Sequence, residues 1–382
     1  MHIERTQHQV IATLLEPGKV VLLYGPRRCG KTTLLHRYLE TVQVPYRYYD
    51  GDDLLVRQEL GSQSIPRLVE LVGDTHLVVI DEAQRIPEVG LNLKILVDNT
   101  SAMILATGSS SFDLAGHTSE TLTGRKFVLR LFPLAQLELV AREDPLRTKA
   151  NLPSRLIYGS YPEVVLAEDL VRRSRLLGEL VGSYLYKDVL ELEGVRHADK
   201  LVRLLQLLAF QVGATISTNE LGTQLGLSKN TVERYLDLLE RCFVLVSLGG
   251  FSRNPRKEIS KSRKYYFWDC GIRNAVIGNF NPLERRDDLG CLWENYLVTE
   301  RLKYLEYREL FARASFWRTY ARQELDWVEE RNGTIHGYEF KWNPKKGRPL
   351  RAWQTAYPEA GYTVVHPGNY LEFITGPTDA TD

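Results

Sequence analysis

Residue types that handle phosphate occur together near the start of the chain. Residues 25–33 read Gly-Pro-Arg-Arg-Cys-Gly-Lys-Thr-Thr, the spacing of a P-loop. The glycines allow backbone N–H groups to wrap a polyphosphate, and a helix that begins at the turn adds the positive end of its dipole. We expect Lys31 to reach the terminal phosphates of a nucleotide and the Thr32 hydroxyl to hold Mg²⁺. The residues expected to contact the nucleotide are Gly25, Pro26, Arg27, Arg28, Cys29, Gly30, Lys31, Thr32 and Thr33.

Two adjacent carboxylates follow a second apolar run. Residues 77–80 read Leu-Val-Val-Ile, which is typical of a buried parallel strand, and Asp81 and Glu82 come directly after it. Ligands of parallel α/β sheets bind beyond the carboxyl ends of the strands, where both acids would lie. We expect Asp81 to hold Mg²⁺ and Glu82 to act as the base for attack on the γ-phosphate. A helix cap, the simpler alternative, explains one acid better than two.

The hydrophobic pattern indicates the elements that must position these groups. An apolar strand ends at Tyr24, an amphipathic helix follows the turn, and residues 46–50 form another strand before the two acids. The strand at 103–108 is followed by Ser109, and the hydroxyls of Thr107 and Ser109 are candidate sensors of the γ-phosphate, with a helix cap as the alternative. The extra strand, the adjacent glutamate and the sensor strand resemble the additional-strand P-loop ATPases, which include the AAA type.

Composition limits the remaining possibilities. A chain of 382 residues is expected to form about two to four domains. Its four cysteines are scattered and one lies inside the phosphate-binding turn, which favours a reducing, cytoplasmic location over a disulfide framework. The net charge of +1 excludes a polyanion-binding surface over the whole chain, so any nucleic-acid surface must be local. The sequence has no apolar run of membrane-spanning length, and we expect no membrane partner.

The middle of the chain loses the strand pattern. Residues 136–195 show helical periodicity and lie where the helical lid of an AAA-type ATPase would follow an ATPase core at 1–135. Residues 196–270 predict a winged helix-turn-helix, with a recognition helix at 231–239 and wing strands at 242–246 and 264–268. A basic segment between these strands would contact DNA phosphates, although the same module also serves as a protein-contact spacer. The residues expected to contact DNA are Lys229, Arg234, Arg253, Arg256, Lys257 and Lys261.

A hairpin is predicted near the C-terminus. Asn332-Gly333 is a strong two-residue turn between two alternating segments, so Arg331 should pair with Thr334. Counting outward sets Asp326 opposite Glu339 and Glu324 opposite Lys341 on one face of the hairpin. The other face would carry Leu325, Trp327, Tyr338 and Phe340.

The acidic face of this hairpin could hold a metal. Opposed carboxylates are unfavourable unless a positive charge lies between them, and a divalent ion would supply that charge. Asp326 followed by Glu339-x-Lys341 resembles the PD-(D/E)XK nuclease layout, which implies Mg²⁺ held by Glu294, Asp326 and Glu339, with Lys341 activating a water and Gln354 as an auxiliary. The alternative is a solvated hairpin face with a Glu324–Lys341 ion pair.

Taken together, the motifs resemble prokaryotic AAA-type ATPases related to the archaeal ATPases, in which a P-loop module precedes a winged helix and a PD-(D/E)XK-like region. The resemblance implies an α/β fold with an additional-strand ATPase core (1–135), a helical lid (136–195), a winged helix-turn-helix (196–270) and an α/β nuclease-like domain (271–382). It also implies ATP and Mg²⁺ as cofactors and a homo-oligomer, with a hexameric ring as one form. Arg125 would then reach the γ-phosphate of a neighbouring subunit, unless it only pairs with a surface acid.

These features predict an ATP-hydrolysing motor or remodeller that binds DNA, with branched or recombination DNA as a candidate substrate. Two alternatives remain. One is a nucleotide-dependent signalling or defence switch in which the nuclease fold is inactive. The other is a metal-dependent DNA nuclease that ATP hydrolysis gates.

Overall fold

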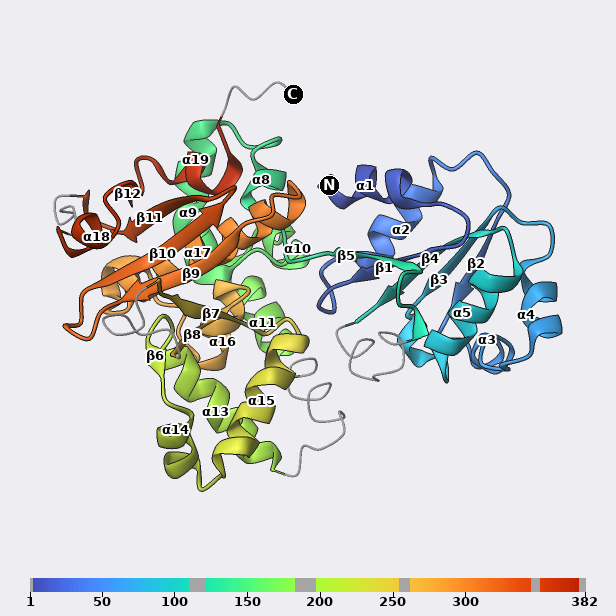
Figure 1. Cartoon of the computed structure of the whole chain (residues 1–382), viewed down its shortest axis with the longest axis horizontal. Coiled ribbons are helices and arrows are strands. Elements are labelled where there is room, and N and C mark those ends of the chain that lie inside the picture. The colour runs from blue at the N-terminus through green and yellow to red at the C-terminus, as the bar shows by residue number, and fades with distance from the viewer. Residues whose placement is uncertain (1–2, 110–120, 183–196, 254–261, 345–350, 378–382) are drawn as a thin grey trace. The chain divides into compact units, whose positions relative to one another are not determined.

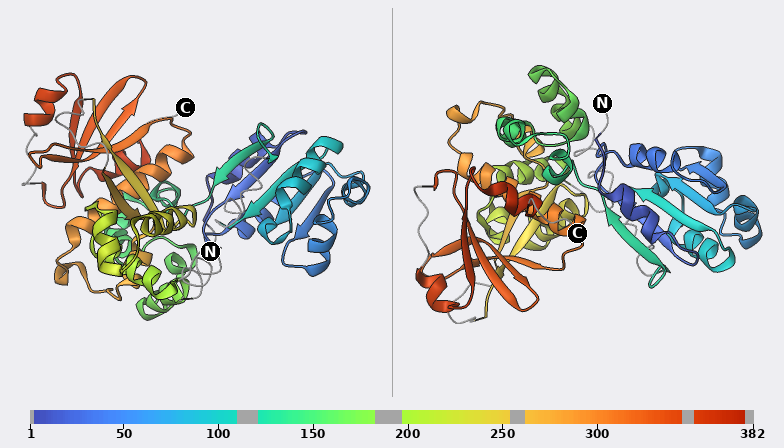
Figure 2. Two further views of the ribbon diagram at one scale, coloured as in Figure 1. Left: turned by 60° about the horizontal axis from the view of Figure 1, so that its bottom comes forward. Right: turned by 90° about the horizontal axis from the view of Figure 1, so that it is seen from above.

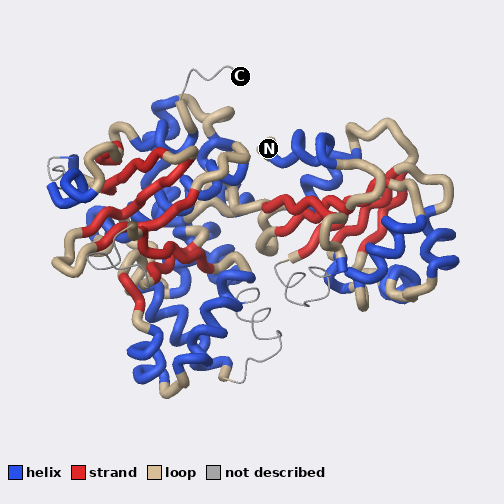
Figure 3. Tube along the Cα trace, in the orientation of Figure 1, coloured by secondary structure: helices blue, strands red, loops and turns tan. Residues whose placement is uncertain are grey.

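The computed structural model describes residues 3–109, 121–182, 197–253, 262–344 and 351–377. The chain divides into two compact units (Figure 1). The first comprises residues 1–133 with 241–243, and the second comprises residues 134–240 with 244–382. Each unit contains one β-sheet, drawn in red in Figure 3. Within the described ranges, no helix is both long enough and apolar enough to cross a membrane.

The first unit is built on a five-stranded parallel sheet of order β2-β3-β4-β1-β5. β4 therefore lies between the strand that precedes the P-loop and the strand that ends at Asp81, as an additional-strand core requires. The extra strand predicted at 46–50 is present as β2. The strands are β1 (Val20–Tyr24), β2 (Tyr46–Asp50), β3 (Leu77–Asp81), β4 (Met103–Gly108) and β5 (Lys126–Arg130).

Helices cover both faces of this sheet (Figure 2). The alternation of β1 explains why: Leu22 packs with α3 to α5 on one face, and Leu23 packs with α1 and α2 on the other. A strand that is buried on both faces must be apolar throughout, as the sequence of β1 is. The helices are α1 (Gln7–Leu14), α2 (Lys31–Leu39), α3 (Leu54–Leu60), α4 (Ile65–Val72) and α5 (Val89–Asn99).

The helices predicted as an ATPase lid belong to the second unit. α9 and α11 pack against α16, and α8 packs against α19, so this segment is joined to the C-terminal half of the chain. The boundary predicted at 195 lies among residues 183–196, outside the described part. These helices are α8 (Gln136–Leu139), α9 (Pro145–Tyr158), α10 (Pro162–Leu166), α11 (Leu170–Glu179), α16 (Cys270–Val276), α17 (Leu289–Tyr307) and α19 (Tyr370–Thr375).

The segment predicted as a helix-turn-helix contains the expected helices. They are followed by a two-stranded antiparallel hairpin, against which a short strand pairs. The first hairpin strand begins at Leu245, later than predicted, because Phe243 adopts a positive φ of 52° in the turn that ends the preceding helix. The elements are α13 (Ala198–Phe210), β6 (Thr215–Ile216), α14 (Thr218–Leu225), α15 (Lys229–Arg241), β7 (Leu245–Phe251) and β8 (Arg263–Phe267).

This hairpin is continuous with the C-terminal strands. β7 pairs in parallel with β9 through Gly250 opposite Phe316 and Phe251 opposite Trp317. The result is one seven-stranded sheet of order β12-β11-β10-β9-β7-β8-β6. Helix α18 (Arg351–Ala356) lies against it through Trp353, which contacts Trp317. The remaining strands are β9 (Arg313–Arg318), β10 (Glu324–Arg331), β11 (Thr334–Phe340) and β12 (Gly361–Val365).

The predicted C-terminal hairpin is present with the predicted turn, and its register agrees with the prediction from Arg331 opposite Thr334 to Trp327 opposite Tyr338. Asn332 and Gly333 both have positive φ, and Arg331 pairs with Thr334. One prediction is wrong, because a bulge between Leu325 and Val328 breaks the alternation of β10. Leu325 and Val328 therefore pack together with Trp353, while Trp327 contacts Phe373 of α19 instead of sharing a face with Leu325.

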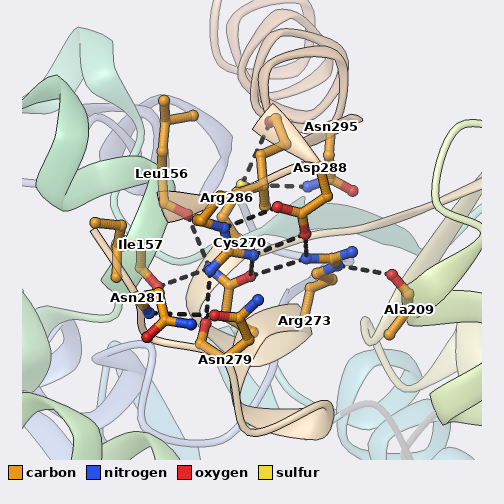
Figure 4. A network of polar contacts seen from close by, with 12 residues as sticks. Leu156, Ile157, Ala209, Cys270, Arg273, Asn279, Asn281, Arg286, Asp288 and Asn295 are labelled. Atoms are coloured by element: carbon orange, nitrogen blue, oxygen red, sulfur yellow. Dashed lines mark hydrogen bonds and ion pairs between the residues drawn. The ribbon is translucent and has the colours of Figure 1, made fainter. Parts of the chain in front are cut away.

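A buried polar network fixes α16 within the second unit (Figure 4). Asn274 donates to the carbonyl oxygens of Leu156 and Ile157 at the end of α9. Arg273 donates to Ala209 of α13 at 2.7 Å, and Asp288 accepts from both Arg273 and Arg286. Burial alone would raise the pKa of Asp288, but these two arginines hold it below its usual value. The network therefore ties α9, α13 and the start of α17 to one short helix.

Candidate functional site

The turn between β1 and α2 has the backbone geometry that the P-loop prediction requires. A Cβ atom on Gly25 would lie 2.1 Å from the carbonyl oxygen of Leu131, so only glycine fits there. Gly30 takes a φ of 100° directly before α2, where other residues are strained. Lys31 is buried, and its Nζ donates to the carbonyl oxygens of Gly25 at 2.9 Å and Pro26 at 3.1 Å. Its ammonium is thus held inside the loop.

Asp81 is the centre of a hydrogen-bond cluster at the carboxyl ends of the strands. Thr32 Oγ1 donates to Asp81 Oδ2 at 2.7 Å, which joins the two motifs that the sequence predicted to share Mg²⁺. Thr107 Oγ1, at the end of β4, donates to the other carboxylate oxygen. Tyr48, on the extra strand β2, also donates to Oδ2 at 3.1 Å. The sequence analysis missed this tyrosine.

Glu82 is held in a defined position beside Asp81. Its backbone has a φ of 47°, and its N–H donates to Thr107 Oγ1 at 3.2 Å. Gln84 Nε2 donates to the Glu82 carboxylate, while Gln84 Oε1 accepts from the N–H of Ser109 at 3.3 Å. The Gln84 side chain therefore connects the predicted base with the predicted sensor position. The sequence alone had indicated no role for this glutamine.

Arg5, to which no motif pointed either, supports the backbone of the P-loop. Arg5 is buried, and its guanidinium donates to the carbonyl oxygens of Cys29 and Phe132, each at 2.6 Å. It therefore links the P-loop with the end of β5. Burial raises the pKa of the Cys29 thiol, although Lys31 and Arg5 oppose the shift. This cysteine is a packing residue, and it is fully buried among the apolar side chains of β1 and α2.

Arg125 lies at the amino ends of the strands, whereas the P-loop lies at their carboxyl ends. It directly precedes β5, whose Lys126 pairs with the first residue of β1. Its Nε is 2.8 Å from Asp98 Oδ1 on α5, and both side chains are partly exposed. This is the surface ion pair that stood as the alternative to a contact with a neighbouring subunit.

The residues predicted to contact DNA are only partly described. Lys229 lies within 3.5 Å of Glu233 on α15, and Arg253 lies 2.7 Å from Glu330 of β10. Arg234 is exposed on the same helix as Lys229. Arg256, Lys257 and Lys261 lie outside the described residues. Lys264, the first residue of the predicted wing strand at 264–268, is almost fully buried.

Lys264 is surrounded by the acids of the predicted nuclease site. Its Nζ lies 3.1 Å from Glu294 Oε1 on α17 and 2.5 Å from Glu324 Oε1 on β10. Burial alone would lower the pKa of Lys264, but Glu294, Asp326 and Glu324 raise it, so the ammonium stays charged. Burial and the nearby Glu294 raise the pKa of Asp326 to about 7. The structure thus brings these acids together around a lysine.

The other predicted members of this site are paired within the chain. Lys341 Nζ lies 2.7 Å from Glu339 Oε1, and Tyr362 donates to the same carboxylate. The Glu324–Lys341 ion pair, which stood as the alternative, is replaced by three others: Lys341 pairs with Glu339, and Glu324 pairs with Lys264 and Arg318. Gln354 is exposed on α18, which packs on the sheet face of Leu325, opposite the face of Trp327 and α19.

These acids do not form a metal site in this arrangement. In the part of the chain that the structure describes, no three His, Cys, Asp or Glu side chains are grouped as metal ligands. The donor set also does not fit a divalent ion, because an ammonium already bridges Glu294 and Glu324.

Comparisons with known proteins match three successive parts of the chain. Residues 17–140 match a family described as an AAA domain. Residues 149–283 and 289–377 match two families described as domains of unknown function, DUF8612 and DUF4143. The chain is 30% identical over 364 residues to the uncharacterized protein Rv2008c of Mycobacterium tuberculosis, covering 93% of this chain and 78% of that protein. The chain belongs to the family of this mycobacterial protein.

More distant relatives occur in other organisms. An uncharacterized protein of Methanocaldococcus jannaschii, MJ1637, is 26% identical over 297 residues, covering 68% of this chain and 62% of that protein. Among solved structures, the Walker-type ATPase PABY2304 of Pyrococcus abyssi aligns with a TM-score of 0.47 and 16% identity, over 71% of this chain and 94% of that one. The first unit of the chain is an AAA-type P-loop ATPase domain.

Proposed function

We propose that the protein binds ATP with Mg²⁺ at the P-loop and hydrolyses it. The observation that carries this proposal is the contact between Thr32 Oγ1 and Asp81 Oδ2, because it places the two expected Mg²⁺ groups 2.7 Å apart. Mg²⁺ would neutralise the developing charge on the phosphates, with Lys31 beside it. Glu82, which follows Asp81 directly, would orient and deprotonate the attacking water.

We further propose that the second unit couples this cycle to DNA, so that the protein acts as a motor or remodeller. The order of helices and strands from α13 to β8 supports a winged helix, with α15 as its recognition helix. Lys229 and Arg234 on α15 and Arg253 after β7 would contact phosphates, together with Arg256, Lys257 and Lys261. Branched DNA is the form we would test first. In a homo-oligomer, such as a hexameric ring, Arg125 would leave Asp98 and reach the nucleotide of a neighbouring subunit.

One observation favours a second candidate, a nucleotide-dependent switch that contacts protein. The exposed face of α15 carries Glu233, Asp237 and Glu240 beside its basic residues, and Glu233 already pairs with Lys229. A DNA-reading helix usually carries an excess of positive charge.

Steady-state ATP turnover with and without DNA distinguishes these candidates. Single-stranded, duplex and four-way-junction DNA should be compared at fixed salt, with Lys31→Ala as the blank. Stimulation by one DNA form, absent in Lys31→Ala, is the expected result for a DNA-coupled motor. Turnover that no DNA changes would contradict the DNA proposal and leave the ATPase proposal intact. Absence of Mg²⁺-dependent turnover under every condition would contradict the ATPase proposal itself.

A further inference from the structure

The carboxylates at the centre of the second unit differ from an open metal site in how they are paired. Glu294 accepts from Lys264 at 3.1 Å and from the hydroxyl of Tyr266 at 2.7 Å. Glu324 lies 2.5 Å from Lys264 and 3.5 Å from Arg318. Asp326 accepts from the backbone N–H of Phe340 at 2.7 Å. Donors of the chain itself thus occupy the positions that a cation would need.

We propose that the Lys264 ammonium takes the place of a divalent cation in this nuclease-like cluster, so that the cluster joins parts of the fold and does not cleave phosphodiester bonds. The burial of Lys264 is the first support: the side chain is 1% exposed, and a lysine rarely occupies such a position unless it is paired. Two acids on different elements hold it, Glu294 from α17 and Glu324 from β10.

The space around the cluster gives independent support. Gly213 lies against the Glu294 carboxylate, since a Cβ atom on that glycine would be 3.1 Å from its carboxyl atoms. The backbone after α13 therefore closes one side of the cluster. A hydrated metal could not approach Glu294 from this side, and Mg²⁺ gives up water reluctantly.

The arrangement also explains what the cluster does. Lys264 and Tyr266 belong to β8, which pairs with β7 and not with the strands that carry the acids. Arg318 of β9 contacts Glu324 and also donates to Thr215 of β6 at 2.7 Å. The cluster therefore connects strands β6 and β8 with α17 and with the C-terminal strands. Removal of the lysine alone would leave buried acids without a counter-charge, which is costly.

Binding of Mn²⁺ to the full chain without nucleotide tests the proposal. The Asp81→Asn background removes the expected ATP-site ligand, so that any remaining Mn²⁺ seen by electron paramagnetic resonance lies elsewhere. In this background we expect no Mn²⁺ binding that depends on Glu294, so Glu294→Gln should leave the spectrum unchanged. In Asp81→Asn/Lys264→Met we expect a new Mn²⁺ site that Glu294→Gln removes, and a melting temperature that millimolar Mn²⁺ raises by several degrees.

A second buried lysine provides the matched control. Lys303 is 1% exposed and pairs with Glu300 at 2.8 Å, and the buried Asp269 is a further acid that interacts with it. Lys303→Met should lower the melting temperature without any rescue by Mn²⁺. The proposal is overturned if the Asp81→Asn protein binds Mn²⁺ in a Glu294-dependent manner, or nicks supercoiled DNA in an Asp326-dependent manner. Both measurements are made on proteins that retain Lys264, so they decide the question even if Lys264→Met fails to fold.

Discussion

The Asp81 carboxylate accepts hydrogen bonds from three hydroxyl groups, which belong to three different elements. Thr32 belongs to α2, Thr107 to β4 and Tyr48 to β2. A carboxylate held in this way has little freedom to rotate, so a bound Mg²⁺ would meet a preformed ligand. Such preorganisation is the main way in which proteins stabilise the charge that develops in phosphoryl transfer.

Glu82→Gln should separate binding from hydrolysis. The amide keeps the size of the side chain but cannot take a proton, so turnover should fall about 100-fold or more while nucleotide affinity stays within a few-fold. Fluorescent-nucleotide binding and phosphate release measure the two quantities. Glu59→Gln, an exposed position on α3, is the matched control. Equal losses of affinity and turnover would refute the role of Glu82 as a base.

Gln84 is expected to act as a positioning residue, since it connects Glu82 to the backbone of Ser109. Gln84→Ala should lower kcat by about tenfold, the scale of one lost charge-assisted hydrogen bond, and leave KM nearly unchanged. Initial rates over a range of ATP concentrations give both values. A change in KM alone would place Gln84 in substrate binding instead.

Asp326 should make stability depend on pH in an unusual direction. Its pKa is raised to about 7 from an ordinary value of 3.8, so the folded state keeps a proton that the unfolded state releases between those values. The free energy of unfolding therefore falls as pH rises through this window, by at most about 1.4 kcal/mol per pH unit for one proton. Asp326→Asn lacks this group, so its stability relative to the wild type should increase from pH 4.5 to 7 and then level off.

Urea unfolding at a series of pH values measures this effect. Glu359→Gln, which changes an exposed carboxyl group after α18, should give a curve parallel to that of the wild type. Parallel curves for Asp326→Asn as well would show that the carboxyl group is ionised normally in the folded protein.

At this scale, site residues that belong to a motif of fixed spacing could be predicted from the sequence. Residues that only the fold brings to the site could not. The P-loop and the Asp81–Glu82 pair follow each other in a known order, so Thr32 and Asp81 could be matched from the sequence alone. Tyr48 and Arg5 are common residue types in unremarkable contexts, and only the strand order and the packing bring them to the site. The burial of Lys264 could not be predicted, because its neighbours in sequence are basic, while β8 buries every residue after Arg263.

At the scale of elements, the contact between α9 and α16 depends on one glycine. A Cβ atom on Gly271 would lie 2.2 Å from the carbonyl oxygen of Tyr158, the last residue of α9. Gly271→Ala should therefore lower the free energy of unfolding by about 1–3 kcal/mol or more, because the backbone of one helix must move. Chemical denaturation measures the change.

Gly178 offers the opposite case for the same substitution. It lies in α11, and a Cβ atom there would meet no atom within 4 Å. Gly178→Ala should stabilise the protein by about 0.5–1 kcal/mol, since alanine is the better helix former. Destabilisation by both substitutions to a similar degree would contradict the assignment to the α9–α16 contact, because helix propensity alone favours alanine at both positions.

Strands and helices could be predicted where a hydrophobic period dominates the sequence. Which of these elements pack together in one unit could not be predicted. The Asn332-Gly333 turn fixed its hairpin because both residues accept a positive φ. The bulge in β10 has no comparable signal, and it changed which residues share a face. The helices of 136–179 were expected to cover the ATPase core, but nothing in their periodicity specifies which unit they join.

At the scale of the whole molecule, a net charge of +1 gives no general attraction for polyanions. If DNA binds, it must do so through a small number of local contacts, and each phosphate contact contributes about −0.9 to the slope of log K against log salt. Arg234→Ala should therefore weaken DNA binding and reduce that slope by about 1, as fluorescence anisotropy at several salt concentrations would measure. Arg147→Ala removes an exposed arginine from α9 and should change neither quantity. An unchanged slope in Arg234→Ala would exclude α15 from the interface.

The parallel pairing of β7 with β9 has a consequence for how the chain can be divided. The two families that match the second unit meet between residues 283 and 289, whereas the seven-stranded sheet continues across this point. A chain that ended at residue 283 would leave β7 with an open edge and Phe251 without Trp317 beside it. Open strand edges are sites at which proteins associate with further copies of themselves. Gene rearrangements that separate the two families would thus carry a cost in solubility, which favours their inheritance as one piece.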